Sequence, residues 1–196
     1  YEMQRSLVGS EMCIRDSATI PPVTPDGATL CIRKFSQHKL GPEEYLKFGT
    51  VDEKMLKFLE MAVIGKANII ISGGTGTGKT TFLNMLSNYI PKGELIVTIE
   101  DTCELQLQSP RVRRMETRTS VATSDMMQVD IAMEVKNALR MRPDRIIVGE
   151  IRDGAIVDML SALSTGHDGG LATVHANSPH NLLTLSLIHI SEPTRL

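Results

Sequence analysis

Between residues 52 and 175, hydrophobic residues occur in two patterns: continuous runs, which are typical of buried strands, and the regular spacing of one face of a helix. Continuous apolar or β-branched runs predict buried strands at 68–72, 95–99, 145–148 and 171–175. A shorter strand is predicted at 29–35. Apolar residues at helical spacing predict helices at 52–63, 82–89, 124–138 and 153–163, and a further helix beginning at 178–179. Strands that alternate with helices indicate an α/β fold with a mostly parallel sheet flanked by helices.

Composition excludes several classes of protein. Of 196 residues, 41% are hydrophobic and 22% charged, as in soluble globular domains. The formal net charge of −2 gives no basic field for nucleic acid or a membrane surface, and the apolar runs are too short for a membrane span. Three cysteines without a CxxC pair exclude a disulfide scaffold and a zinc ribbon.

Neither end of the chain shows the strand pattern or the helix pattern of hydrophobic residues. Residues 1–17 and 186–196 resemble translated vector or adapter read-through, and we expect both to be non-native tails. The alternative is a genuine flexible terminus at each end. On the first interpretation, fold reasoning applies to residues 18–185.

A glycine-rich loop follows the predicted strand at 68–72. It reads Gly73-Gly74-Thr75-Gly76-Thr77-Gly78-Lys79-Thr80 and fits G-x-x-x-x-G-K-[ST] at every fixed position, with Thr81 next. Glycines allow backbone N–H groups to surround a polyphosphate, Lys79 adds a charge, and Thr80 offers a hydroxyl to Mg²⁺. The strand before and the helix after favour an ATP and Mg²⁺ site over a flexible Gly/Thr turn.

Carboxylates follow two other predicted strands. Glu150 follows the strand at 145–148 and Gly149, as in a Walker B segment, and Glu100, Asp101 and Glu104 follow the strand at 95–99. Mg²⁺ prefers such oxygen ligands, and a carboxylate can orient or deprotonate an attacking water. We expect Glu150 and Asp101 near the metal and a general base among Glu100, Asp101 and Glu104. The alternative is a set of solvated surface acids.

Four segments carry a family resemblance: SGGTGTGKTTFLN, VTIEDTCELQL, NALRMRPDRIIVGEIRDG and TGHDGGLATVHANSP. Over about 22–185 the chain resembles the secretion ATPase superfamily of type II and type IV secretion systems, and most closely its Flp/Tad-type pilus assembly ATPases. The resemblance implies a RecA-like P-loop NTPase core at 51–185, preceded at 18–50 by the end of an N-terminal domain and a linker strand. Family members carry more sequence at both ends, so we expect the core to be incomplete.

The resemblance also implies roles for individual residues. Gly73–Thr80 is the Walker A motif, Glu104 is the catalytic acid of the family's Asp box, Gly149-Glu150 is the Walker B motif, and His167 and His175 belong to its His box. Arginines that neutralise transition-state charge across a subunit interface would be Arg33, Arg114 and Arg118. The alternative for these arginines is an exposed charged strand face. Arg140 and Arg145 are expected to brace the Walker B strand.

The resemblance implies a hexameric cytoplasmic motor at the inner membrane of a bacterium. ATP hydrolysis would drive pilin polymerisation or protein export through membrane platform proteins, without direct contact to nucleic acid. The alternatives are a conjugation or DNA-secretion ATPase of the same fold, or a nucleotide-binding fragment without catalysis. Residues 119–134 resemble the family less than their surroundings do, which leaves interface contacts there open.

Overall fold

The computed structural model describes residues 13–34, 40–118, 128–151, 155–164, 166, 168–176, 178 and 180–181. The chain divides into two compact units, residues 1–39 and residues 40–196. In the first unit, β1 (Cys13–Thr19) pairs antiparallel with β2 (Thr29–Lys34). The second strand was predicted from its sequence, but β1 was not, because no apolar alternation marks it.

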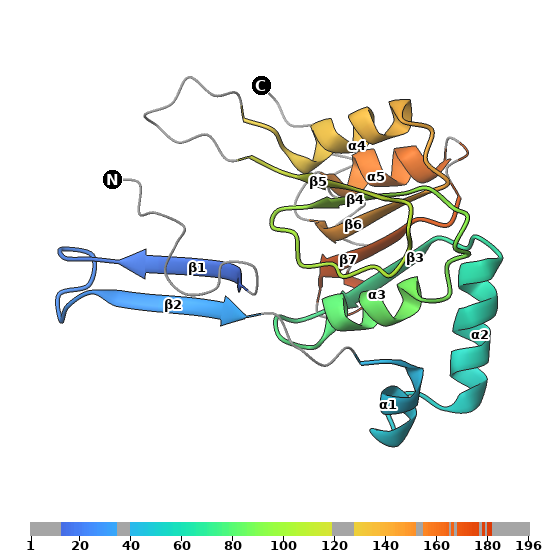
Figure 1. Ribbon diagram of the computed structural model, residues 1–196, viewed down its shortest axis with the longest axis horizontal. Coiled ribbons are helices and arrows are strands. Elements are labelled where there is room, and N and C mark those ends of the chain that lie inside the picture. Colours follow the sequence, from blue (N-terminus) through green and yellow to red (C-terminus); the bar gives the residue numbers. More distant parts are fainter. Residues whose placement is uncertain are drawn as a thin grey trace. The chain divides into compact units, whose positions relative to one another are not determined.

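The second unit contains a five-stranded parallel sheet in the order β3-β7-β6-β4-β5. Its strands are β3 (Ile69–Gly73), β4 (Ile96–Glu100), β5 (Val112–Glu116), β6 (Arg145–Ile151) and β7 (Leu171–His175). Since all five run the same way, their carboxyl ends share one edge, on the left of the sheet in Figure 1. The predicted α/β class and parallel sheet are therefore confirmed.

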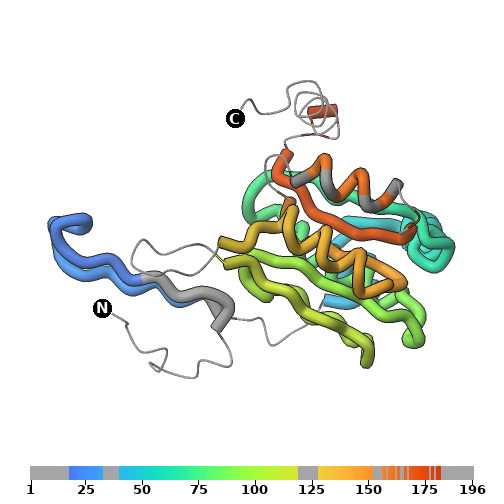
Figure 2. The backbone as a smooth tube through the Cα atoms, turned by 90° about the horizontal axis from the view of Figure 1, so that it is seen from above, coloured from blue at the N-terminus to red at the C-terminus, as the bar shows by residue number. Residues whose placement is uncertain are grey.

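Helices cover both faces of the sheet (Figures 1 and 2). They are α1 (Pro42–Lys47), α2 (Glu53–Ile64), α3 (Lys79–Ser87), α4 (Ile131–Arg140) and α5 (Ala155–Ser164). One core joins α4 and α5 to the sheet through residues such as Val97 and Val148. The other joins α1–α3 to the opposite face through Ile96, Ile147 and Leu171. Alternation along β4 and β7 thus directs successive side chains to the α3 face and the α4 face in turn, whereas in β6 the pairing with β7 shifts register between Val148 and Ile151.

Two local predictions were wrong. The strand at 68–72 was expected to be buried on both faces, but β3 is an edge strand of the described sheet and its five residues are half-buried. Helix α4 was expected to begin at Ser124, but Asp130 is its N-cap and accepts a hydrogen bond from the Met133 N–H at 2.8 Å. Residue 124 lies outside the described residues.

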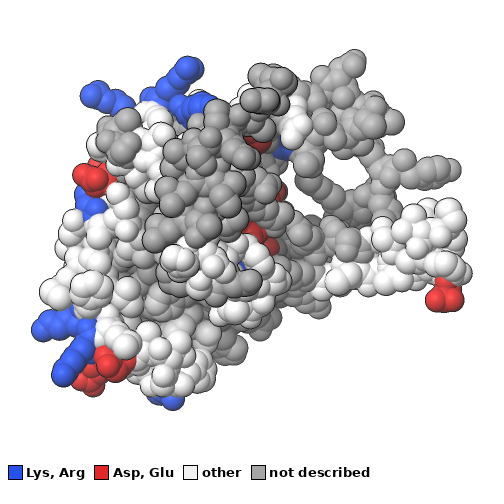
Figure 3. All heavy atoms as spheres, turned by 180° about the vertical axis from the view of Figure 1, so that it is seen from behind, with Lys and Arg blue, Asp and Glu red and all other residues white. Residues whose placement is uncertain are grey.

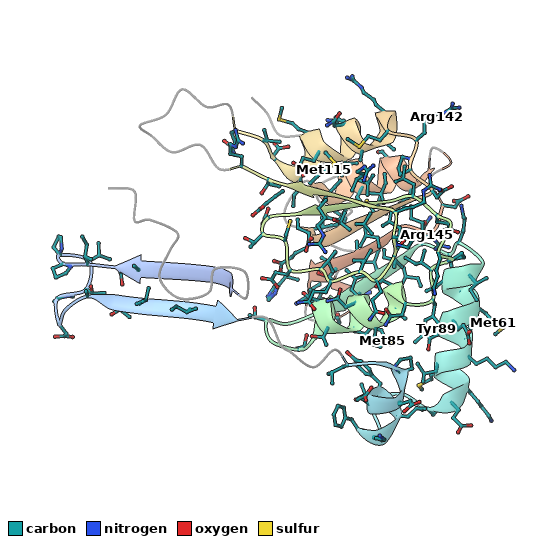
Figure 4. All side chains as sticks on the ribbon, viewed as in Figure 1. Met61, Met85, Tyr89, Met115, Arg142 and Arg145 are labelled. Atoms are coloured by element: carbon teal, nitrogen blue, oxygen red, sulfur yellow. The ribbon has the colours of Figure 1, made fainter. Side chains whose placement is uncertain are left out.

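A buried arginine fastens the start of β6. Arg145 is fully buried and forms an ion pair with Glu94, and its Nη1 donates to the carbonyl oxygen of Gly169 at 3.3 Å. A Cβ at Gly169 would lie 2.7 Å from that nitrogen, so this glycine gives the guanidinium its space. Figure 4 shows Arg145 at the edge of the sheet opposite the carboxyl ends. Arg145 therefore braces β6, as predicted, whereas Arg140 is exposed.

The described surface carries charges of both signs, which lie close to one another on the face in Figure 3. Exposed apolar side chains gather on α2 and include Met55, Phe58 and Met61. Met61 projects from the outer side of this helix in Figure 4. Among the described residues, no helix combines the length and hydropathy that a bilayer crossing requires.

Replacement of Arg145 by methionine should lower the free energy of unfolding by about 3 kcal/mol, because the largely buried Glu94 would lose its partner. Denaturant unfolding of the purified chain measures this. Arg140→Met is the matched control, expected to change stability by less than about 0.5 kcal/mol because Arg140 is exposed. Equal effects of the two substitutions would contradict the bracing role.

Candidate functional site

The glycine-rich loop connects β3 to α3 by a tight turn. Gly76 and Gly78 have φ angles of 74° and 88°, in the left-handed region that favours glycine. A Cβ on Gly73 would lie only 2.8 Å from Thr77 Oγ1. The pattern of glycines therefore follows from the path of the backbone.

Polar groups of this loop converge on Gly74. Lys79 Nζ donates to the Gly74 carbonyl oxygen at 2.8 Å, and Thr77 Oγ1 donates to the same oxygen at 2.9 Å. Gly78 is the N-cap of α3 and provides no side-chain cap for the first turn. Thr80 is half-buried in that turn and Thr81 is exposed. The loop thus places an ammonium group, hydroxyls and a helix N-terminus together, a donor set that suits phosphate.

The acidic loop after β4 is attached to two elements. Glu100 Oε1 accepts hydrogen bonds from the backbone N–H groups of Glu104 at 2.9 Å and Leu105 at 2.8 Å. The next N–H group, of Gln106, donates to Asn84 Oδ1 of α3 at 2.9 Å. Leu105 itself is buried in the core beneath α3. The backbone of the loop is therefore fixed to both β4 and α3.

Gly149, the residue before Glu150, packs closely against the side chain of Glu100 on β4. A Cβ on Gly149 would lie 2.8 Å from Glu100 Cγ and 3.2 Å from Glu100 Oε1. The Gly149 carbonyl oxygen accepts a hydrogen bond from the hydroxyl of Thr173 on β7. Glu150 follows, half-buried, near the carboxyl end of β6. Packing between β4 and β6 thus explains the glycine of this motif.

Burial raises the pKa of Glu100 to about 7. Its two backbone hydrogen bonds and the positive charge of Arg114 oppose this shift, whereas the negative charge of Glu104 adds to it. Glu100 is 2% exposed, and within the described part of the chain its Oε2 has no hydrogen-bond partner. Near neutral pH the carboxyl group therefore exchanges between its neutral and charged forms.

Asp101, Arg114 and Arg118 lie on β5 or close to it. Thr117 Oγ1 donates to Asp101 Oδ1 at 2.9 Å. The exposed Arg114 on β5 acts on the pKa of Glu100 and of Cys103, so its charge lies close to the acidic loop. Strand β5 ends at Glu116, and Arg118, just beyond it, forms an antiparallel bridge with Val129.

Two histidines and one arginine complete the predicted set. His175 is exposed at the end of β7, and its Nδ1 lies 3.5 Å from Thr75 Oγ1 in the glycine-rich loop. His167 lies outside the described residues. Arg33 belongs to β2 in the other unit, and its side chain also lies outside the description. Of these three residues, the structure places His175 beside the glycine-rich loop.

Two features of the site were not predicted from the sequence, the role of Asn84 and the contact between Glu100 and Gly149. Asn84 is a polar residue between the buried Leu83 and Met85, which is the one local sign of an inward role. Among the residues that the structure describes, no group of three or more His, Cys, Asp or Glu side chains could hold a metal alone. A Mg²⁺ ion held by Thr80, one carboxylate and phosphate oxygens needs no such group.

Comparison with known proteins identifies the relatives of this chain. The family model described as type II/IV secretion system protein matches residues 2–187. An uncharacterized protein of Methanocaldococcus jannaschii is 45% identical over 185 residues, which is 91% of this chain and 25% of that protein. The conjugal transfer protein TrbB of Rhizobium radiobacter is 36% identical over 182 residues, which is 89% of this chain and 53% of that protein. The chain thus spans between a quarter and about half of these relatives.

Among solved structures, the VirB11 ATPase of the Brucella suis type IV secretion system, in complex with sulphate, has a similar fold. The TM-score is 0.61 at 24% sequence identity, and the match covers 91% of this chain and 63% of that chain. The predicted RecA-like architecture is therefore confirmed.

The raised pKa of Glu100 predicts a pH-dependent effect of Glu100→Gln. The native state holds this proton more tightly than the unfolded state, so the wild type loses stability from this group as pH rises from about 4.5 to about 7. Glutamine removes that loss. The difference in unfolding free energy, variant minus wild type, should shift in favour of the variant between pH 5 and pH 8.

Denaturant titrations of both proteins at the two pH values measure this shift. Other buried acids, such as Glu134, whose pKa is also raised by burial, contribute equally to the stability of both proteins, so their effect cancels in this difference. A difference that stays constant from pH 5 to pH 8 would contradict the raised pKa.

Proposed function

The chain belongs to the type II/IV secretion system protein family, and on this premise we propose that it binds and hydrolyses ATP for a secretion machine. The observation that carries the proposal is the glycine-rich loop at Gly73–Thr80, which enters α3 at the edge where β4 and β6 deliver Glu100, Glu104 and Glu150. A phosphate cradle and carboxylates at one sheet edge are what hydrolysis of a nucleoside triphosphate requires.

The loop residues would hold the phosphates: Gly73, Gly74, Thr75, Gly76, Thr77, Gly78, Lys79, Thr80 and Thr81. Lys79 Nζ donates a hydrogen bond to the Gly74 carbonyl oxygen. On binding of ATP it would donate to a phosphate oxygen instead, with little movement of the lysine side chain. When bound, Mg²⁺ would neutralise phosphate charge, held by the Thr80 hydroxyl and Glu150, with Asp101 as a further candidate. His175, beside Thr75, would contact the phosphate region.

Glu104 is the proposed acid that orients the attacking water. It is half-buried and follows β4 on a loop fixed by its backbone, whereas Glu100 on the same loop is buried and bound to two N–H groups. Arg114 and Arg118 are exposed on β5 and just beyond it, where a neighbouring subunit could use them to neutralise transition-state charge. The roles of His167 and Arg33 remain predictions from the sequence.

The assembled state is also part of the proposal. We place the chain in a cytoplasmic hexameric ring that acts on platform proteins of the inner membrane and drives pilus assembly or protein export. A role in conjugation is the second candidate, favoured by the 36% identity to the conjugal transfer protein TrbB. Genes for pilin and prepilin peptidase beside this gene would favour the first role, and genes for a relaxase or coupling protein the second.

Lys79→Ala should weaken binding of Mg²⁺–ATP at least tenfold and abolish phosphate release, because the loop would lose its positive charge. Isothermal titration with a non-hydrolysable ATP analogue measures binding, and a phosphate-release assay measures turnover. The control is Lys57→Ala, at an exposed lysine of α2 outside the loop. Unchanged binding in Lys79→Ala would rule out this loop as the nucleotide site.

A further inference from the structure

We propose that Glu100 and Asn84 are positioning residues that clamp the backbone of 104–106 and thereby fix Glu104 at the nucleotide site. The proposal rests on the proposed function for the role of Glu104, but the clamp is a property of the chain itself. It assigns Glu100 a role different from that of general base, which its sequence position suggested. Asn84, the last residue of the segment SGGTGTGKTTFLN, gains a role that was not predicted from the sequence.

The clamp consists of three consecutive backbone donors and two side-chain acceptors. Glu100, from β4, takes the N–H groups of Glu104 and Leu105, and Asn84, from α3, takes that of Gln106. These donors lie in a segment without helix or strand, so no ladder would satisfy them if the side chains were removed. The hydrogen bond of the Leu105 N–H is buried and the other two are partly buried. A buried N–H group without a partner costs about 1–3 kcal/mol, which is enough to move a loop.

The two acceptors come from α3 and β4, the elements that carry the glycine-rich loop and the acidic loop. Asn84 lies on α3, the helix that begins at the glycine-rich loop, and Glu100 ends the strand that carries the acids. The side chain of Leu105, 1% exposed, enters the core between them with Leu83 and Leu86. Any shift of the loop would therefore break hydrogen bonds on both sides and withdraw Leu105 from the core.

The burial of Glu100 argues against a direct role in proton transfer. Its residue is 2% exposed, Oε1 is occupied by two N–H groups, and Cγ fills the space that Gly149 leaves on β6. What the loop needs from residue 100 is an oxygen acceptor at Oε1, and a neutral amide oxygen provides one. Glutamine should therefore replace Glu100 in the clamp, whereas it could not replace a general base.

Amide hydrogen exchange measured by NMR on the whole chain tests the clamp directly. In Glu100→Ala, exchange at Glu104 and Leu105 should accelerate at least tenfold, and Glu100→Gln should restore most of the protection. In Asn84→Ala, the acceleration should centre on Gln106. Asn88→Ala, at an exposed asparagine that caps the end of α3, is the control and should leave all three amides unchanged.

Unchanged exchange in Glu100→Ala, or exchange in Glu100→Gln as fast as in Glu100→Ala, would overturn the proposal. Should Glu100→Ala not fold, Asn84→Ala decides: acceleration at Gln106 supports the clamp, and none overturns it. This measurement does not require hydrolysis, so it separates failure of the clamp from failure of the ATPase assignment, which Lys79→Ala tests.

The steady-state kinetics of ATP hydrolysis provide a second measurement. A change in kcat without a change in KM would distinguish the positioning of Glu104 from a contribution of Glu100 to stability alone. Glu100→Ala should lower kcat for ATP at least tenfold while KM changes less than about twofold, because the phosphate loop stays intact. Glu100→Gln should recover most of the lost kcat. A glutamine variant as slow as the alanine variant, with its amides still protected, would make the charge of Glu100 essential and overturn the positioning role.

Discussion

Parallel pairing of the five strands is the constraint on which the site depends. It brings the ends of β3, β4, β6 and β7 to one edge, and with them the phosphate loop, two acidic segments and His175. Yet β7 and β6 lie between β3 and β4, so the acids of β4 start three strands away from the glycine-rich loop. The loop after β4 spans this distance by packing on α3 and binding Asn84, which makes that helix part of the acidic site as well as of the phosphate site.

Glycines mark the places where this sheet carries polar side chains close to the backbone. Gly149 faces Glu100, Gly169 faces Arg145, and Gly73 faces Thr77, each with less than 3 Å between the facing atom and the position a Cβ would take. At one edge of the sheet a buried acid ends β4, and at the other a buried arginine begins β6. The glycines of the motifs therefore serve packing between strands as well as approach to phosphate.

Most of the fold could be predicted from the sequence because buried apolar residues recur at short, regular intervals along each strand and helix. The strand at 171–175 was predicted residue for residue, and the boundaries of β3, β4 and β6 differ from the predicted ones by at most three residues, since apolar runs end where strands leave the core. The exceptions depend on distant partners. The edge position of β3 follows from the order of the strands in the sheet. Likewise, Asn84 meets Gln106 across 22 positions, a contact that no local period encodes.

We propose that the glycine-rich loop and the acidic loop form one nucleotide site. Backbone amide spectra of the chain, recorded during titration with Mg²⁺ and a non-hydrolysable ATP analogue, test whether both loops respond to one ligand. Saturable shifts are expected at residues 74–81 and, with the same midpoint, at 100–106, while the exposed face of α2 stays unchanged. Shifts confined to 74–81, with the amides of 100–106 unmoved at saturation, would contradict the proposal.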